Sequence, residues 1–324
     1  MQKATINHNE STARILAATL TLIAREQKTH SPPFSLWTPE LGAKEIKKAA
    51  QEVVSGQAQV IWVDEGHPSY GLMLLGKQAL ETSLLGSGAG RLKGPFLVDS
   101  DSISRQEKTQ SLVSKAKELA KLLNYRFLSA KITHDPAVIR GFNSEGFLAA
   151  EIITSLEGQI SPVILEEITH LKFPSIELQS SDNVDSSVLL DKLGDLFYDG
   201  HYLHSPVLPS DFSKRLWAKV AIAKIEAGNT ALFALDQRQK EPVGLALPCL
   251  DGEEARLTIL HVSESFRNLG LGEYLLKNCL AQVYERGARF LKAETASWNL
   301  PALSLYIKVG LKPVAPFVAL HYAI

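Results

Sequence analysis

The stretch Arg267-Asn-Leu-Gly-Leu-Gly272 decides how this chain folds and what it can hold. It follows Ala255–Val262, an apolar and β-branched run that is typical of a strand. It precedes apolar residues at positions 274, 275, 279, 280, 283 and 284, a spacing that is typical of a helix. Glycines at such a junction let backbone N–H groups converge and let a phosphate approach without meeting Cβ atoms. The N-terminus of the helix adds unsatisfied donors and partial positive charge, so the pattern predicts a diphosphate-binding loop.

The glycine spacing separates this loop from two other phosphate-binding loops. A P-loop would end in Gly-Lys-Ser/Thr, and a Rossmann fingerprint would carry three glycines and an acidic residue about 20 positions further on. The pattern Arg-x-x-Gly-x-Gly is shorter than both. It resembles motif A of the GNAT superfamily of acyl-CoA-dependent N-acetyltransferases, in which this loop holds the pyrophosphate of coenzyme A.

A second segment, residues 296–311, resembles motif B of the same superfamily. It supplies Asn299, Ala302, Leu305, Tyr306 and Gly310 in register, with Leu311 at the position where the family usually has Phe. The resemblance covers residues 184–324. Within the superfamily it is most similar to the sugar N-acetyltransferases typified by dTDP-fucosamine acetyltransferase, through the Phe-Tyr-x-x-x-Tyr-x-His segment at 197–204, the helix around Trp217 and the aromatic-His strand at 317–322.

The resemblance implies acetyl-CoA as co-substrate, no metal, and a site drawn from a strand, a loop and a helix. The implied cofactor-binding residues are Leu260, His261, Val262, Arg267, Asn268, Leu269, Gly270, Leu271, Gly272, Asn299, Ala302 and Tyr306. In the family a bulge in the strand exposes a backbone N–H that binds the thioester carbonyl, and here we expect that donor within 260–262. Tyr306 is the candidate general acid, since a phenol with a pKa near 10 matches a thiolate leaving group. The base stays open among His261, Glu264, His201 and His204.

The first half of the chain repeats the second without the phosphate loop. Residues 135–147 resemble motif B at an offset of 164, which aligns Gly146 with Gly310 and Phe142 with Tyr306. Opposite the glycine loop stands Ile103-Ser-Arg-Gln-Glu-Lys108, which has no glycine and carries a carboxylate that would repel a phosphate. We therefore expect an α/β (α+β) protein with two GNAT-like mixed-sheet domains in tandem, of which the first is degenerate.

The expected domains are residues 1–160 (degenerate, without a cofactor loop), a linker at 161–183, and the catalytic domain at 184–324. We expect the cofactor to bind in the catalytic domain and not in the first one, and we expect residues 184–324 to bind acetyl-CoA even without the rest of the chain. The net charge of −1 gives no basic field for nucleic acid or an anionic membrane. The N-terminus lacks the apolar core of a signal peptide, and the cysteines at 249 and 279 are spaced for neither zinc nor a disulfide framework. A cytoplasmic monomer or homodimer is expected.

The leading function is transfer of an acetyl group from acetyl-CoA to a primary amine of a small molecule, with a nucleotide-linked amino sugar as one candidate acceptor. Two alternatives remain. One is a protein or peptide N-acetyltransferase, which predicts an open acceptor groove. The other is a non-catalytic acyl-CoA-binding sensor, which predicts cofactor affinity without turnover.

Overall fold

A computed structural model describes residues 39–62, 71–97, 101–162, 173–183, 185–193 and 202–324. The chain divides into two compact units. Unit 1 comprises the chain up to Glu151 together with Ser205–Val207 and Phe317–Ile324, and unit 2 comprises Ile152–His204 and Leu208–Pro316. This division differs from the boundaries expected from the sequence. Residues 152–160 and the expected linker, part of which forms strand β6 (Ile176–Ser180), belong to unit 2. Residues 205–207 and the last residues of the chain belong to unit 1.

Unit 1 is built on a mixed sheet of the order β1-β2-β3-β4-β11. Its strands are β1 (Ala58–Trp62), β2 (Leu72–Lys77), β3 (Gly88–Phe96), β4 (Tyr125–Thr133) and, from Phe317 onward, β11 (Lys312–Ala323). Strands β3 and β4 run parallel, and the other neighbouring pairs are antiparallel. The described part of this unit contains the helices α2 (Pro39–Val54), α3 (Ala79–Leu85), α4 (Ser102–Leu122) and α5 (Pro136–Ser144).

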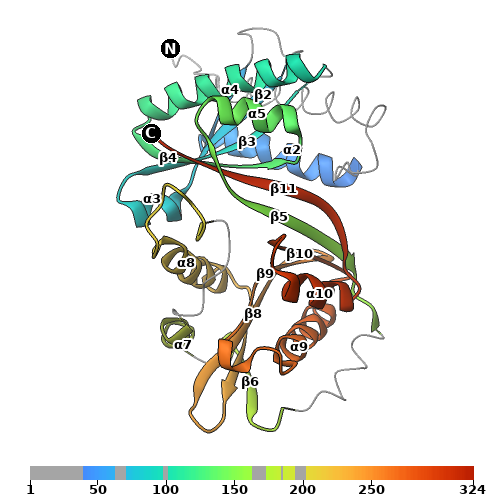
Figure 1. The fold of residues 1–324 in the computed structure, drawn as a ribbon. Coiled ribbons are helices and arrows are strands. Elements are labelled where there is room, and N and C mark those ends of the chain that lie inside the picture. Colours follow the sequence, from blue (N-terminus) through green and yellow to red (C-terminus); the bar gives the residue numbers. More distant parts are fainter. Residues whose placement is uncertain (1–38, 63–70, 98–100, 163–172, 184, 194–201) are drawn as a thin grey trace, which may run out of the picture. The chain divides into compact units, whose positions relative to one another are not determined.

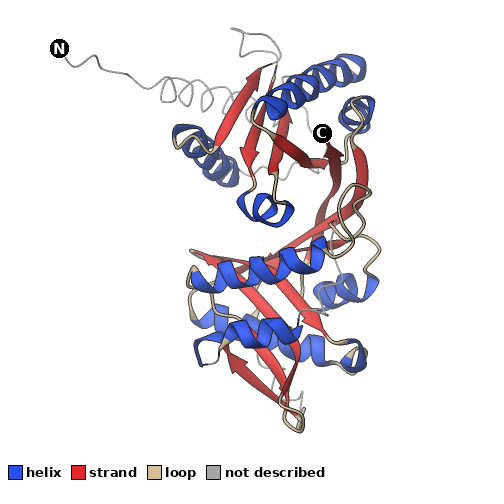
Figure 2. Cartoon of the chain, turned by 90° about the vertical axis from the view of Figure 1, so that its left-hand side faces the viewer, coloured by secondary structure: helices blue, strands red, loops and turns tan. Residues whose placement is uncertain are grey.

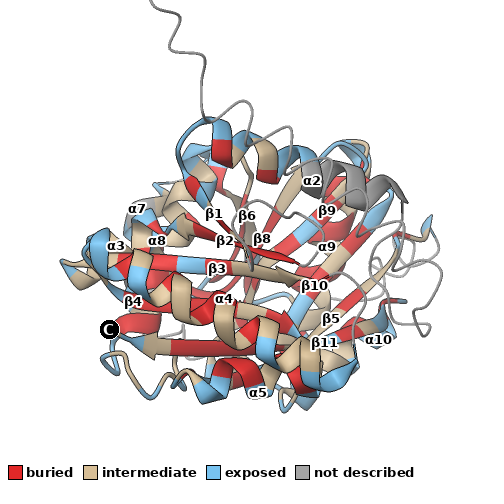
Figure 3. Ribbon diagram, turned by 90° about the horizontal axis from the view of Figure 1, so that it is seen from above, coloured by how far each residue is buried: buried red, intermediate tan, exposed pale blue. Residues whose placement is uncertain are grey.

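The core of unit 1 lies on both faces of this sheet. One cluster joins apolar residues of α4 and α5 to Leu75, Leu92 and Leu128, and a second joins α2 to Leu72 and Leu74. Leu74 and Leu75 point to opposite faces because side chains alternate along a strand. Because both faces are covered, β2 is buried at four consecutive positions, Leu72 to Leu75, whereas α4 carries both buried and exposed residues (Figure 3).

Unit 2 repeats this plan with a sheet of the order β5-β10-β9-β8-β7-β6. Its strands besides β6 are β5 (Leu148–Gln159), β7 (Leu232–Asp236), β8 (Glu241–Asp251), β9 (Glu254–Val262) and β10 (Phe290–Ala296). Among the strands that the structure describes in this unit, only β9 and β10 pair in parallel. The α-helices that the structure describes in this unit are α7 (Ser186–Leu193), α8 (Phe212–Glu226), α9 (Leu271–Glu285) and α10 (Leu300–Lys308).

The helices of unit 2 cover both faces of its sheet (Figure 2). Residues of α9 and α10 share one core with the sheet, including Leu275, Leu280 and Tyr306. Residues of α7 and α8 share another core with Phe233 and Leu245. In Figure 1, α9 and α10 lie beside each other, away from α7 and α8. The helix that follows the glycine loop is therefore anchored to the sheet along one apolar face.

The last strand of each repeat joins the sheet of the other unit. Strand β5 follows α5 in the chain, yet its residues 153–159 pair with β10 of unit 2. Strand β11 follows α10, yet its residues 317–323 pair with β4 of unit 1. Each sheet is thus completed by a strand from the other half of the sequence. Within the described residues, no helix combines the length and the apolar character needed to cross a membrane.

Candidate functional site

Strand β9 leads into the glycine loop and carries a bulge near its middle. Its antiparallel pairing with β8 is regular from Val262↔Gly244 to Ile259↔Leu247 and then shifts, because Pro248 pairs with Leu257. The extra residue is Thr258. The expected bulge is therefore present in the strand, but it lies upstream of residues 260–262, where we expected the donors.

The pairing pattern shows where the backbone amides beyond the bulge point. The Ser263 N–H donates to the Val243 carbonyl at 2.8 Å, which makes this a hydrogen-bonded pair. In an antiparallel ladder such pairs alternate with pairs whose polar groups face outward. The N–H groups of Leu260 and Val262 consequently point away from β8, whereas that of His261 points toward it.

On the outward side, β9 loses its other neighbour. Parallel pairing with β10 ends at Leu257↔Ala293, although β10 continues to Ala296 on β5. Beyond that point the edge of β9 that carries the Leu260 and Val262 amides is no longer in the ladder with β10. Of the three expected donors, the structure thus brings Leu260 and Val262 to an open strand edge.

The bulge also decides where the side chain of His261 lies. Leu257 and Leu260 both pack with the core under α9, whereas Ile259 packs with the core under α7 and α8. His261, two residues after Ile259, is on that second face and is 7% exposed. Burial, and after it the positive charge of Arg267, lowers the pKa of His261 to about 4. Its imidazole is therefore neutral at physiological pH.

The loop itself begins with the short 3-10 turn η3 (Glu264–Phe266) and turns through two residues with left-handed backbone. Asn268 has a φ of 61° and Gly270 a φ of 88°, a conformation for which glycine has no steric cost. The side chain of Arg267 folds back, and its Nε donates to the Val262 carbonyl at 2.9 Å. Leu269 at the tip is 63% exposed.

Helix α9 starts directly after this loop, and its N-terminus has no side-chain cap. Gly270 occupies the N-cap position, where a Ser, Thr, Asp or Asn would commonly bind the first amides. A Cβ at Gly272 would meet Leu305 and Val262 at 3.6 and 3.7 Å, so the first turn of α9 faces both β9 and α10. The helix thus offers the amides of its first turn, and the positive end of its dipole, to an anion.

Helix α10 carries the other expected site residues. Asn299 caps it, accepting from the Ala302 N–H at 3.3 Å, and its amide donates to Thr295 Oγ1 at 3.2 Å. Both residues expected at the cofactor are therefore engaged with each other in this structure. Tyr306 is 5% exposed and lies in the core that α9 and α10 share.

The corresponding place in unit 1 is built differently. Residues 103–108, which align with the glycine loop, already lie inside α4. The carboxylate of Asp101 caps this helix, accepting from the N–H groups of Ile103 and Ser104 at 2.9 and 3.0 Å. The hydrogen bond from Ser104, which outweighs partial desolvation, lowers the pKa of Asp101, so the cap is anionic. A carboxylate of the chain therefore occupies the helix N-terminus that is open in unit 2.

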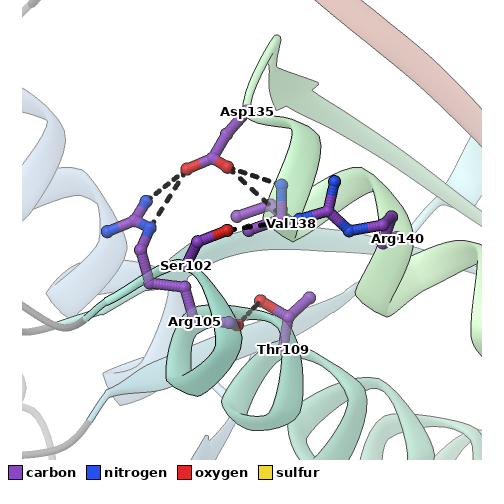
Figure 4. A network of polar contacts seen from close by, with 7 residues as sticks. Ser102, Arg105, Thr109, Asp135, Val138 and Arg140 are labelled. Atoms are coloured by element: carbon purple, nitrogen blue, oxygen red, sulfur yellow. Dashed lines mark hydrogen bonds and ion pairs between the residues drawn. The ribbon is translucent and has the colours of Figure 1, made fainter.

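In unit 1 a second carboxylate binds the amides at the start of α5, the helix that corresponds to motif B (Figure 4). Asp135, the counterpart of Asn299, caps α5 through the amides of Ala137 and Val138 and also binds the Arg105 guanidinium of α4. Burial opposes its ionisation, but the hydrogen bond and charge of Arg105 outweigh burial and hold the pKa of Asp135 below its usual range. Phe142, at the place of Tyr306, is fully buried.

Lys292 of β10 forms an ion pair with Glu254 of β9 at 2.6 Å, so it links these two strands. The remaining residues expected near the acceptor come from the segment 197–204. Phe197, Tyr198 and His201 lie outside the described residues. The ring of His204 meets that of Trp298 edge to face, with centroids 5.5 Å apart.

Sequence reasoning missed two features near the site. Trp298 immediately precedes Asn299 and is 53% exposed, and an aromatic next to a motif asparagine was the available signal. Glu273 in the first turn of α9 binds Lys277 and Lys308, and the i, i+4 spacing of Glu273 and Lys277 was visible in the sequence.

Cys279 is fully buried, and burial raises its pKa to about 12.

Comparisons with known proteins agree with this geometry. Residues 197–311 match the acetyltransferase (GNAT) family. A tandem GNAT protein from the clavulanic acid biosynthesis pathway, solved without AcCoA, aligns with a TM-score of 0.56 at 14% identity, over 95% of this chain and 94% of that one. A GCN5-related N-acetyltransferase from Sphaerobacter thermophilus aligns with a TM-score of 0.58 at 14% identity, over 96% and 93%. One from Kribbella flavida aligns with a TM-score of 0.52 at 14% identity, over 86% and 94%.

A sequence search of curated proteins found no match. The family match covers the glycine loop and the helix that carries Tyr306, and the structural likeness extends over both halves of the chain. Residues 197–311 therefore match the acetyltransferase (GNAT) family, and the two halves of the chain together have the fold of tandem GNAT proteins.

Proposed function

We propose that the chain is an acetyl-CoA-dependent N-acetyltransferase that binds one acetyl-CoA, in unit 2. The observation that carries this proposal is the glycine loop, which opens onto the uncapped N-terminus of α9 beside the open edge of β9. The described residues of unit 1 do not form this arrangement, because the carboxylates of Asp101 and Asp135 bind the corresponding amides. The loop residues Arg267 to Gly272 would hold the diphosphate, mainly through backbone amides.

The reaction needs the acetyl carbonyl to be polarised and the thiolate to be protonated as it leaves. The amides of Leu260 and Val262 are the proposed donors to the carbonyl oxygen, since they face the open edge of β9. The Tyr306 hydroxyl is the proposed proton donor to the thiolate. Holding both reactants in place supplies a further large part of the rate.

We propose direct transfer to the amine rather than passage through a cysteine of the enzyme. Cys279 stays protonated at neutral pH because its pKa is raised to about 12, and it lies on the buried face of α9, in the core shared with the sheet. A protonated, buried thiol is a poor nucleophile. The acceptor must bring its amine to the open edge of β9 in the neutral form.

The acceptor that we propose is a small primary amine, with a nucleotide-linked amino sugar as one candidate. Trp298 supports a ring-bearing acceptor, because its exposed ring stands beside Asn299 and against His204. Aromatic faces commonly pack against planar or apolar rings. We also propose a cytoplasmic location and a monomeric or homodimeric state, as expected from the sequence.

A pair of substitutions at Gly272 tests the proposal. Its φ is not positive and a Cβ there makes only ordinary contacts, so Gly272→Ala should fold and bind acetyl-CoA almost as the parent does. Gly272→Glu adds a carboxylate at the first turn of α9 and should weaken binding at least tenfold, through like-charge repulsion and crowding. Calorimetry on both variants and on the full chain measures this.

Four results would decide against the proposal or redirect it. Two acetyl-CoA molecules per chain would show a second cofactor site, and equal affinity of the two variants would place the cofactor away from the glycine loop. Binding without release of the coenzyme A thiol, over a panel of amino sugars, polyamines and peptides, would favour a sensor. Thiol release with peptides alone would favour a protein or peptide acetyltransferase.

A further inference from the structure

Three charged side chains, those of Glu273, Lys277 and Lys308, meet beside the first turn of α9. The Glu273 carboxylate binds Lys277 Nζ at 2.9 Å and Lys308 Nζ at 2.6 Å. Lys277, in α9, is only 3% exposed, whereas the Lys308 side chain, in the last turn of α10, is 62% exposed. A lysine is rarely so buried unless a specific partner requires its charge.

Glu273 stands at a position where a carboxylate commonly turns toward the start of its own helix. It is the third residue after the N-cap Gly270, the place at which the acid of a capping box reaches back to the N-cap amide. There it would put a negative charge on the donors that a diphosphate needs. Unit 1 shows the consequence, because the carboxylate of Asp101 does occupy the N-terminus of α4.

In unit 2 the Glu273 carboxylate is ionised, but it binds two lysines instead of the amides at the start of α9. Burial opposes its ionisation, yet the hydrogen bonds from Lys308 and Lys277 outweigh burial and hold the pKa of Glu273 below its usual range. The structure places both lysine ammonium groups on the carboxylate, and α9 has no side-chain cap. The three groups together carry one net positive charge.

We infer that Lys277 and Lys308 are positioning residues that hold the Glu273 carboxylate away from the N-terminus of α9 and so keep its amides open to the diphosphate. This inference rests on the proposed function. One electrostatic arrangement then accounts for the burial of Lys277, for the glutamate in the first turn of α9 and for the absence of a side-chain cap on this helix. It also ties the helix that starts at the loop to the helix that carries Tyr306.

A double-mutant cycle in the full chain tests this inference. Lys277→Met with Lys308→Met removes both ammonium groups and keeps most of the side-chain volume. It should weaken acetyl-CoA binding roughly fivefold, the scale of one carboxylate acting on a helix terminus. The same lysine changes combined with Glu273→Gln should leave the affinity within about twofold of Glu273→Gln alone.

Calorimetry measures the acetyl-CoA affinity of each variant, and circular dichroism checks that each variant is folded. If the loss of affinity persists in the Glu273→Gln background, the lysines act on the phosphates directly and the inference is overturned. Unchanged affinity in the Lys277→Met, Lys308→Met variant overturns it equally. If this variant does not fold, the exposed Lys308→Met alone, with and without Glu273→Gln, gives the same comparison. A parent chain that binds no acetyl-CoA refutes the proposed function instead.

Discussion

The hydroxyl of Tyr306 is the smallest feature on which the proposed chemistry depends. Its ring is packed in the core shared by α9 and α10, so Tyr306→Phe removes one oxygen and keeps the packing. We expect the turnover number to fall by about 10² to 10⁴, the usual contribution of general acid catalysis, with acetyl-CoA affinity nearly unchanged. Steady-state kinetics and calorimetry measure the two quantities. A turnover number within about threefold of the parent would remove Tyr306 from the acid role.

Two buried histidines make stability depend on pH. Burial and then Arg267 lower the pKa of His261 to about 4, and burial and then Arg91 do the same for His321 in unit 1. Because the unfolded chain binds these protons near pH 6.5 and the folded chain only near 4, the free energy of unfolding should decrease as pH falls from about 6.5 to 4. Denaturant titrations across that window measure the slope. His321→Gln should flatten it, and an unchanged slope would show that His321 titrates normally.

Residue-level chemistry was the part most accessible to the sequence. The glycine positions follow from a local requirement, since Gly270 and Gly310 both adopt left-handed backbone at a helix boundary. The apolar helix positions follow from packing on a sheet. The orientation of a side chain was less accessible, because the bulge at Thr258 reverses which face His261 occupies. One inserted residue changes this face, and no residue type marks it.

At the scale of single elements, the two repeats differ most at their helix starts. Helix α9 begins at a glycine without a side-chain cap, whereas α4 begins at Asp101 and is joined to α5 through Arg105 and Asp135. The absence of glycines from this part of the first repeat is visible in the sequence. It did not predict that the helix would extend through the loop position, because a run such as 102–106 suits a helix or a loop equally well.

Replacing Asp135, the residue that caps α5, should change the stability of the chain but not its affinity for acetyl-CoA. Asp135→Ala removes a helix cap and the partner of Arg105, and we expect it to lower the free energy of unfolding by about 1–2 kcal/mol. Acetyl-CoA affinity should stay the same, since we place the cofactor in unit 2. Thermal denaturation and calorimetry on the same preparation test both parts. Weaker acetyl-CoA binding by a folded Asp135→Ala variant would show that unit 1 contributes to the cofactor site.

At the scale of the whole molecule, the exchange of last strands is what the sequence did not reveal. The repeat was visible because each half has its own strand and helix pattern, and the tandem fold follows from it. The sheet that a strand joins depends on pairing between residues far apart in sequence, for which local periodicity carries no signal. Strands β5 and β11 both read as the end of their own repeat, yet each pairs with the other one.

This exchange changes what a truncated chain should do. The sequence led us to expect that residues 184–324 alone bind acetyl-CoA. The structure shows that this fragment lacks β5, which pairs with β10 along its whole length, and β6 at the other edge of the sheet. It also carries residues 317–323 without their partner β4. Unpaired strand edges and uncovered apolar surface favour aggregation.

We therefore expect residues 184–324 to aggregate, or to unfold without cooperativity, and to bind no acetyl-CoA. Residues 152–316 restore β5 and β6 and omit the strand segment that belongs to unit 1, so this fragment should unfold cooperatively and keep an affinity within about tenfold of the full chain. Size-exclusion chromatography, thermal denaturation and calorimetry compare the two fragments. A folded 184–324 fragment with the affinity of the full chain would show that the exchanged strand is dispensable for the cofactor site. A folded 152–316 fragment that binds acetyl-CoA but transfers no acetyl group would assign acceptor binding, rather than support of the fold, to unit 1.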